Sequence, residues 1–138
     1  MEKYLGVKLI EAESCWGLNN KCVDPNSEHC GQEVKGYKVV YEDGYTSWSP
    51  KDVFEKAYRK IKKFDFEYLA SKCSEEYQVR VCEEARELDY KISKLNSFIT
   101  NPAAPFVTLK EDEQTRLKQQ LMAMQYYLTI LIERIENF

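Results

Sequence analysis

Two long segments toward the end of the chain repeat apolar residues at alternating steps of four and three. The first segment carries Val81, Ala85, Leu88, Ile92, Leu95 and Ile99, and the second carries Leu117, Leu121, Met124, Leu128, Leu131 and Ile135. This heptad spacing places the apolar residues along one face of a helix, where they form a seam. The linker TNPAAPFVT contains Pro102 and Pro105, which stop a helix, and Thr108 stands in capping-box register with Glu111. We therefore predict an antiparallel hairpin of two long helices.

The first third of the chain has strand-like rather than helical patterning. Residues 4–12 alternate apolar and polar side chains, as a half-buried strand does, whereas residues 13–35 lose all periodicity and are typical of a long surface loop. Two short strand-like runs then flank Asp43-Gly44, a dipeptide that favours a tight hairpin turn. These patterns predict a small antiparallel sheet.

A helix start follows the predicted sheet. Ser49 is a candidate cap and Pro50 suits the first helical position. We expect the face of this helix that covers the sheet to carry Val53, Phe54, Ala57, Tyr58 and Ile61. The predicted fold class is α+β, with residues 1–64 forming the sheet-plus-helix module and residues 65–138 the helical hairpin, packed as one compact unit.

Composition and charge exclude several classes of protein. The chain has 138 residues, 43% of them hydrophobic, and its 20 basic and 23 acidic residues give a net charge of −3. No bulk positive field is available to bind a nucleic-acid polymer, and no apolar run approaches the ~20 residues of a membrane span. Without a recognisable export signal we expect a cytosolic protein, and in that compartment the five cysteines are expected to be reduced thiols.

The reactive side chains form no recognisable catalytic motif, which favours a protein that is not an enzyme and carries no cofactor. His29 is the single histidine, and no serine or cysteine near it forms a nucleophile motif. No glycine-rich phosphate-binding motif occurs, and the acidic pairs point in different directions on a helix. A zinc site made by Cys15, Cys22, His29 and Cys30 is a minor alternative, since their spacing lacks a C-x-x-C pair.

Three features each allow a structural and a functional interpretation. Residues 51–64 carry six basic and two acidic residues, which either complement the dipole of their helix or contact phosphates. Met122, Tyr126, Tyr127, Ile130 and Ile132 lie off the second seam, and either form a subunit interface or pack within the chain. Trp16 either folds onto the sheet edge or stacks on a ligand as a lid.

Two parts of the sequence resemble a known family. The strings KYLGVKLIEAE and GYKVVYEDGYTSWSPKDVFEKAYR resemble the N-terminal module of small phage proteins, in particular of the first-described Thoeris anti-defence family. The strings YQVRVCEEARELDYKISKLNSFI and LKEDEQTRLKQQLMAMQYYLTILIERI are similar to the helical hairpin of that family. Each half also occurs in other phage proteins, so the combination is more specific than either half.

The resemblance implies a sponge that binds a signal without degrading it. Members of the family sequester a cyclic ADP-ribose isomer made by bacterial TIR-domain proteins, and so block Thoeris immunity in the cytoplasm of the infected host. Some members also take up cyclic trinucleotides, and the assembly is similar to a hexamer built from dimers. Arg59 and Arg116 would pair with the pyrophosphate, and Phe98, Trp16 or Tyr127 would stack on adenine. The implied ligand-binding residues are Trp16, Trp48, Arg59, Arg80, Asn96, Phe98, Arg116, Gln120, Met124 and Tyr127.

A second function class remains open. A phage adaptor could use the helical hairpin to dock onto a host or virion protein, and the surplus apolar face of the last helix would serve that role equally well. An enzyme that degrades the same signal is a weaker third interpretation, because no metal cluster, base or nucleophile constellation is present in the sequence.

Overall fold

The computed structural model describes residues 1–24, 31–103 and 105–138 and divides the chain into two compact units. Residues Lys8–Arg59 form one, here called the sheet unit, and Met1–Val7 with Lys60–Phe138 form the other, the helical unit. The sequence pattern had indicated a boundary at residue 64 within a single compact unit. The predicted α+β class, with a small antiparallel sheet before two long helices, is confirmed.

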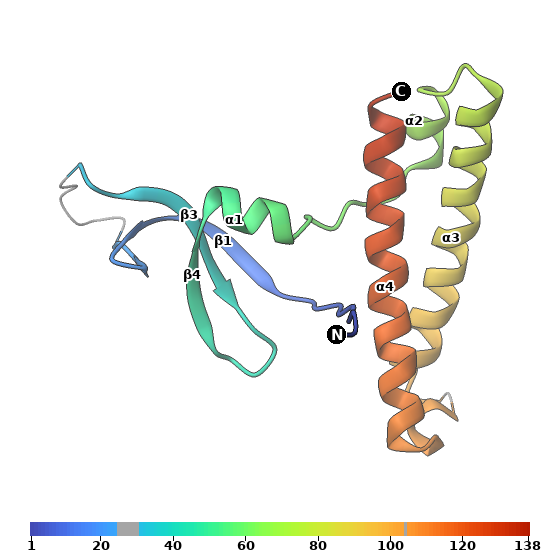
Figure 1. The fold of residues 1–138 in the computed structure, drawn as a ribbon. Coiled ribbons are helices and arrows are strands. Elements are labelled where there is room, and N and C mark those ends of the chain that lie inside the picture. Colours follow the sequence, from blue (N-terminus) through green and yellow to red (C-terminus); the bar gives the residue numbers. More distant parts are fainter. Residues whose placement is uncertain (25–30, 104) are drawn as a thin grey trace. The chain divides into compact units, whose positions relative to one another are not determined.

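The sheet unit contains a four-stranded antiparallel sheet in the order β2-β1-β3-β4 (Figure 1). The strands are β1 (Glu11–Leu18), β2 (Lys21–Cys22), β3 (Val34–Val40) and β4 (Thr46–Pro50). β1 pairs with β3 from Glu11↔Val40 to Gly17↔Val34, and β3 pairs with β4. The strand predicted at 4–12 begins only at Glu11, because residues 4–10 pair with no strand of the described residues.

Within the described residues of the loop predicted at 13–35, residues 13–18, 21–22 and 34–35 are strand. β1 continues to Leu18, and Asn19 and Asn20 then adopt φ values of 52° and 60° to turn the chain directly into β2. Asparagine tolerates this left-handed region, which a two-residue hairpin of type I′ requires at both positions. The His29 and Cys30 of the predicted loop lie outside the described residues.

The hairpin predicted around Asp43-Gly44 is confirmed, although its turn is longer than two residues. The Tyr41 and Tyr45 backbones pair, and the Gly44 N–H donates to the Tyr41 carbonyl at 2.9 Å. Only Gly44, with φ 85°, adopts the left-handed conformation within this turn. The three-residue loop ending in a left-handed glycine is a common hairpin connection.

Helix α1 (Lys51–Ala57) is shorter than the sequence indicated. Pro50 is the residue at its N-terminal cap, and Ser49 belongs to β4 and makes no capping hydrogen bond. The chain is extended from Tyr58, so the predicted helical face does not reach Ile61, which is 54% exposed. Like charges at helical spacing, such as Lys56 with Lys60, disfavour continuation of the helix.

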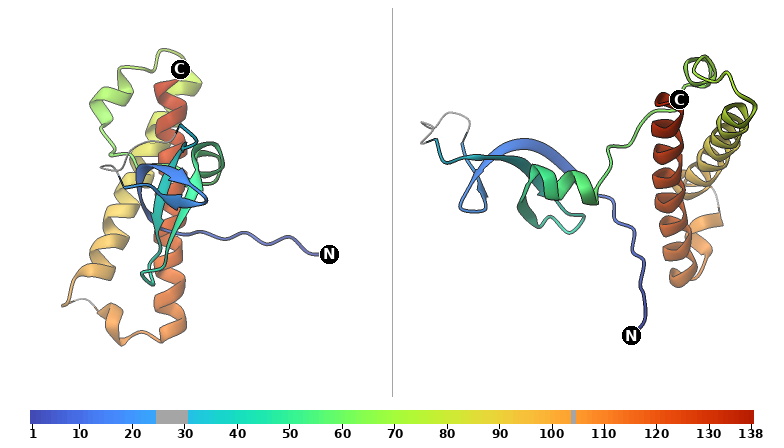
Figure 2. Two further views of the ribbon diagram at one scale, coloured as in Figure 1. Left: turned by 90° about the vertical axis from the view of Figure 1, so that its left-hand side faces the viewer. Right: turned by 45° about the horizontal axis from the view of Figure 1, so that its top comes forward.

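The helical unit is built on α3 (Glu76–Thr100) and α4 (Glu111–Glu136), which run side by side in opposite directions (Figure 1 and Figure 2). Short helix α2 (Phe66–Ala70) precedes α3, and the Asp65 side chain caps it by accepting from the Tyr68 N–H. A 3₁₀ turn, η1 (Pro105–Thr108), joins the long helices. The Thr108 hydroxyl bonds the Pro105 carbonyl, so Thr108 does not cap α4 as predicted.

The core of the helical unit contains residues of both predicted seams together with others. Its buried residues are Leu69, Cys82, Ala85, Ile92, Leu128, Leu131, Ile132 and Ile135. Ile132 lies off the predicted seam, and the sequence left open whether it forms a subunit interface or packs within the chain. It is 1% exposed, so it packs within the chain. In the part of the chain that the structure describes, no helix has both the length and the apolar character needed to cross a membrane.

Candidate ligand-binding surfaces

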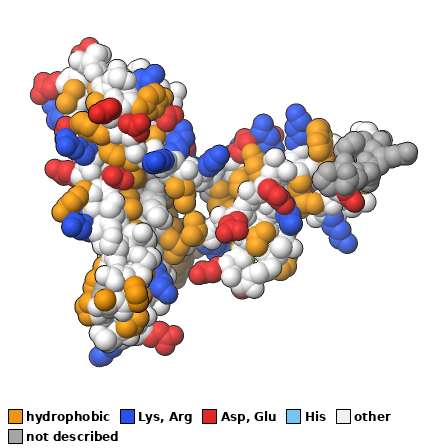
Figure 3. Space-filling model, turned by 180° about the vertical axis from the view of Figure 1, so that it is seen from behind, with side chains coloured by type: hydrophobic (Ala, Val, Ile, Leu, Met, Phe, Trp, Pro, Cys, Tyr) orange, Lys and Arg blue, Asp and Glu red, His pale blue; other side chains and the backbone are white. Residues whose placement is uncertain are grey.

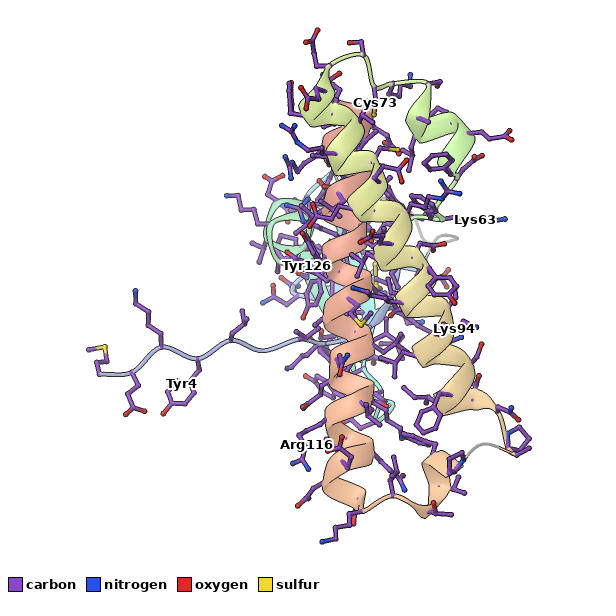
Figure 4. The ribbon with its side chains drawn as sticks, turned by 90° about the vertical axis from the view of Figure 1, so that its right-hand side faces the viewer. Tyr4, Lys63, Cys73, Lys94, Arg116 and Tyr126 are labelled. Carbon is purple, nitrogen blue, oxygen red and sulfur yellow. A yellow bond between two sulfur atoms is a disulfide. The ribbon has the colours of Figure 1, made fainter. Side chains whose placement is uncertain are left out.

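One stripe along α4 carries four of the predicted ligand-binding residues. Arg116, Gln120, Met124 and Tyr127 follow each other at steps of four, four and three, which places them on one helical face that meets the seam at Met124. We call this set the α4 stripe. Arg116, Gln120 and Tyr127 are exposed and Met124 is half-buried against the core. Figure 4 shows Arg116 projecting from the half of α4 nearest η1.

The two ends of the α4 stripe are held by carboxylates. The Arg116 Nε donates to the Glu113 carboxylate at 2.8 Å, one turn earlier on the same helix. The Tyr127 hydroxyl donates to the Glu84 carboxylate of α3, and this hydrogen bond raises the pKa of Tyr127. An arginine held in place by a carboxylate still has donors left for a phosphate, because its guanidinium carries five N–H groups.

An aromatic pair lies at the η1 end of the hairpin. The Phe98 ring meets the Phe106 ring edge-to-face, with centroids 5.9 Å apart, and the Lys118 ammonium lies 5.9 Å from the Phe106 centroid. Asn96 is exposed two residues before Phe98, and its carbonyl accepts from the Thr100 hydroxyl. Aromatic and cationic groups therefore gather at this end of the helical unit.

Arg80 lies too far along α3 to join Phe98 in one small-molecule site of a single protomer. The two residues are separated by about 27 Å at 1.5 Å per residue. A site of several hundred Å³ is only about 10 Å across. Arg80 also pairs with Glu76 at 2.9 Å, near the start of α3.

The remaining predicted site residues, Trp16, Trp48 and Arg59, belong to the sheet unit. Trp48 packs across the sheet over Gly17 and Gly36, where a Cβ atom at either glycine would overlap the indole. Its Nε1 donates to the Cys15 carbonyl at 3.5 Å. These contacts give Trp48 a packing role, whereas Trp16 is 44% exposed and Arg59 is exposed at the end of the unit.

A hollow on the opposite face of the sheet from Trp48 surrounds Trp16. We call it the sheet hollow. Its volume is about 260 Å³, and it is lined by Ser14, Cys15, Trp16, Lys35, Gly36, Tyr37 and Lys51. Sequence reasoning named only Trp16 of this set. The sequence could not show that the other residues line the same hollow, because the β1–β3 register places Lys35 opposite Trp16 and Tyr37 opposite Ser14.

Part of the basic run that precedes the helical hairpin is used in packing. The Lys62 ammonium makes a 2.7 Å ion pair with the Glu136 carboxylate, which raises the pKa of Lys62. This residue therefore helps to fasten the segment before α2 to the end of α4.

The expectation of reduced thiols is wrong for two of the cysteines. A disulfide joins Cys15 to Cys22, whose Cα atoms are 6.0 Å apart across the β1–β2 hairpin. Because Asn19 and Asn20 were interpreted as part of a long loop rather than as a hairpin turn, the proximity of the two cysteines was not predicted. Cys73 and Cys82 are free thiols, and burial raises the pKa of Cys82 to about 11. Two of the four ligands of the alternative zinc site are thus bonded to each other, and the other two lie outside the described residues.

Side chains of different character are mixed on both units. Figure 3 shows hydrophobic groups interspersed with basic and acidic ones on the face in view. Within the described residues, no group of three or more histidine, cysteine, aspartate or glutamate side chains is placed to hold a metal ion.

Comparison with known proteins finds a family match over the helical hairpin. Residues 75–137 match the family model described as Sequestin. No curated protein and no solved structure matches the chain. The match covers α3, η1 and α4, which is less than half of the chain, and it is consistent with the resemblance to the Thoeris anti-defence family. At this coarse level it supports a sequestering, anti-defence role for the hairpin.

Proposed function

We propose that the protein binds and sequesters a cyclic ADP-ribose signal made by TIR-domain proteins without degrading it. The observation that carries this proposal is the match of residues 75–137 to Sequestin, together with the arginine and aromatic residues that the same hairpin exposes. The protein acts as a binder rather than an enzyme, in the host cytoplasm, and removes the signal by mass action when it is in excess. Assembly into a hexamer built from dimers is part of the same proposal.

The η1 end of the hairpin offers the groups that such a ligand needs. The Arg116 guanidinium supplies planar donors for a pyrophosphate, and Phe98 supplies a ring for a purine. Tyr127 lies eleven residues, or about 16 Å, along α4 from Arg116, so its ring would stack on a ligand held between protomers. Gln120, one turn from Arg116 on the α4 stripe, adds amide donors and an acceptor that can read base or ribose edges. Cyclic trinucleotides are a second ligand class within this proposal, since they offer the same phosphates and bases.

Calorimetric titration of the full chain with the cyclic ADP-ribose isomer tests the proposal. Tight binding, followed by recovery of intact ligand after heat denaturation, is the expected result. Recovery of a cleaved ligand would instead assign a degrading activity. The absence of binding by the cyclic ADP-ribose isomer and by cyclic trinucleotides would remove the sponge function.

Arg116→Ala is the variant that locates the site, and Arg80→Ala is its matched control. Both arginines lie exposed on a long helix and pair with a glutamate of the same helix. Loss of a charge-assisted phosphate contact should weaken binding at least tenfold in Arg116→Ala. An equal loss in Arg80→Ala would place the ligand against both ends of the hairpin, as a contact between protomers would require.

An adaptor function is the second candidate, favoured by the outer face of α4. Tyr126 is 45% exposed, and Met122 and Ile130 are half-buried on the same face, one turn to either side. Figure 4 shows Tyr126 partway along α4. An apolar helix face of this kind suits a partner helix or groove. An adaptor would release no nucleotide on denaturation.

A further inference from the structure

The sheet hollow combines two cations with an exposed aromatic ring. Trp16 and Lys35 are directly opposite in the β1–β3 register, and the Lys35 Nζ lies 5.5 Å from the centre of the Trp16 ring. Lys51, the first residue of α1, lines the same hollow. The indole and two lysine side chains therefore border the same hollow.

Neither lysine of the hollow is neutralised by a carboxylate of the described residues. Lys38, on the other face of β3, provides the contrast, because it forms a 3.4 Å ion pair with Glu13 on β1. Two cations that share a hollow repel each other, and an anion bound between them removes that repulsion. The charge arrangement therefore favours an anionic ligand.

Tyr37, which also lines the hollow, is fixed in place. The Tyr37 ring stacks on Phe54 of α1 with centroids 4.2 Å apart, and its hydroxyl donates to the Glu55 carboxylate at 2.8 Å. Ser14, opposite Tyr37 in the sheet register, adds a hydroxyl that can donate or accept. Because Tyr37 is held at both its ring and its hydroxyl, the hollow is largely formed before any ligand enters.

We propose that the sheet hollow is a binding site for a phosphorylated planar ligand of mononucleotide size. The ligand's ring stacks on Trp16, and its phosphate lies between Lys35 and Lys51. A volume of about 260 Å³ is at the small end for ligand sites, which suits a single nucleoside phosphate rather than a dinucleotide. All the lining residues belong to the sheet unit, so the site uses none of the hairpin residues of the proposed function.

Calorimetry of the full chain with three probes tests the chemistry of the site. AMP carries both ring and phosphate, adenosine only the ring and inorganic phosphate only the charge. AMP is expected to bind at least tenfold more tightly than either of the other two, because stacking and charge pairing each contribute about a factor of ten. Equal binding of AMP and inorganic phosphate would overturn the planar part of the proposal, and no binding of AMP at millimolar concentration would overturn it entirely.

Variants locate the binding within the sheet unit. Trp16→Ala and the double variant Lys35→Gln/Lys51→Gln should each weaken AMP binding about tenfold or more. Lys38→Gln removes one positive charge from the same strand on the other face, and should change the affinity less than twofold. Circular dichroism spectra that overlay that of the unmodified protein would show that each variant is folded.

Two further outcomes distinguish the sheet hollow from a hairpin site and from a single-strand binding surface. AMP binding should be unchanged when the protein is already saturated with the cyclic ADP-ribose isomer, and competition between the two ligands would move AMP to the hairpin and overturn the proposal. Affinity for oligonucleotides that rises with their length would identify a single-strand binding surface in place of a mononucleotide site. Failure of AMP to bind would leave the test with the cyclic ADP-ribose isomer unaffected, because that test depends on the hairpin.

Discussion

The Tyr127 hydroxyl donates a hydrogen bond to the Glu84 carboxylate, so a residue expected to stack on a ligand also links α4 to α3. The ring of Tyr127 remains 44% exposed while its hydroxyl is engaged. Structural and ligand-binding roles of this residue can therefore be separated by removing the hydroxyl alone.

Tyr127→Phe should keep ligand affinity within about twofold if the ring provides the contact, because stacking does not need the hydroxyl. The same variant should lower Tm by on the order of 2 °C, since one solvent-exposed hydrogen bond between the long helices is lost. Calorimetric titration and thermal melting measure the two effects. A large loss of affinity with an unchanged Tm would instead assign the hydroxyl to the ligand.

Alkaline pH should weaken the fold through two tyrosines. Hydrogen bonds to Glu55 and Glu84 raise the pKa of Tyr37 and Tyr127 above the ordinary value of 10.0. Because the protonated forms are favoured in the folded state, their contribution is complete below about pH 10 and is lost as the pH rises through the raised pKa values. The difference in urea midpoint between the unmodified protein and the double variant Tyr37→Phe/Tyr127→Phe should therefore shrink from pH 8 to pH 11. A constant difference would contradict this linkage.

Leu131→Ala should destabilise the helical unit by about 2–5 kcal/mol, because it removes methyl and methylene groups from a fully buried position and leaves a cavity. Val79→Ala is the matched control, since Val79 lies on α3 but is 47% exposed. Val79→Ala should change the free energy of unfolding by no more than about 0.5 kcal/mol. Urea unfolding followed by helical circular dichroism compares the two, and equal costs would show that the seam is not the core.

Cys82 should resist alkylation in the folded protein. It is 2% exposed, and burial raises its pKa to about 11, so little thiolate is present at pH 8. A short pulse of iodoacetamide at pH 8 followed by peptide mass mapping should label Cys73 ahead of Cys82. Both should react at similar rates in urea. Rapid labelling of Cys82 without denaturant would show that α2 and α3 separate readily.

The Cys15–Cys22 disulfide should stabilise the β1–β2 hairpin. In the loop-entropy model, closing so short a loop lowers the entropy of the unfolded chain and raises the free energy of unfolding by about 2 kcal/mol. Protein purified without reductant should yield a proteolytic peptide that links the two cysteines. The variant Cys15→Ser/Cys22→Ser should lower the stability of the sheet unit and leave helical circular dichroism unchanged. A chain in which both thiols can be alkylated without reductant would refute the disulfide.

The helical hairpin was predictable because heptad spacing is a local property of the sequence. A residue four or three positions from the last one lies on the same helical face whatever its surroundings, so the seams and the proline-rich connection indicated α3 and α4. Helix ends were less predictable. Thr108 and Ser49 are both residue types that commonly cap helices. In the structure, however, the Thr108 hydroxyl donates to the Pro105 carbonyl and the Ser49 hydroxyl to the Pro50 carbonyl.

Sequence alone thus determined the α+β class, the long hairpin and the arginine and aromatic residues on α4. Only the tertiary structure decided that Trp16 faces Lys35, that Cys15 meets Cys22 and that Trp48 covers two glycines. The physical reason is the range of the interactions. Helical neighbours are fixed by spacing within one segment, whereas neighbours in a sheet are fixed by the register between strands. The sheet hollow therefore forms only when β1 and β3 are paired.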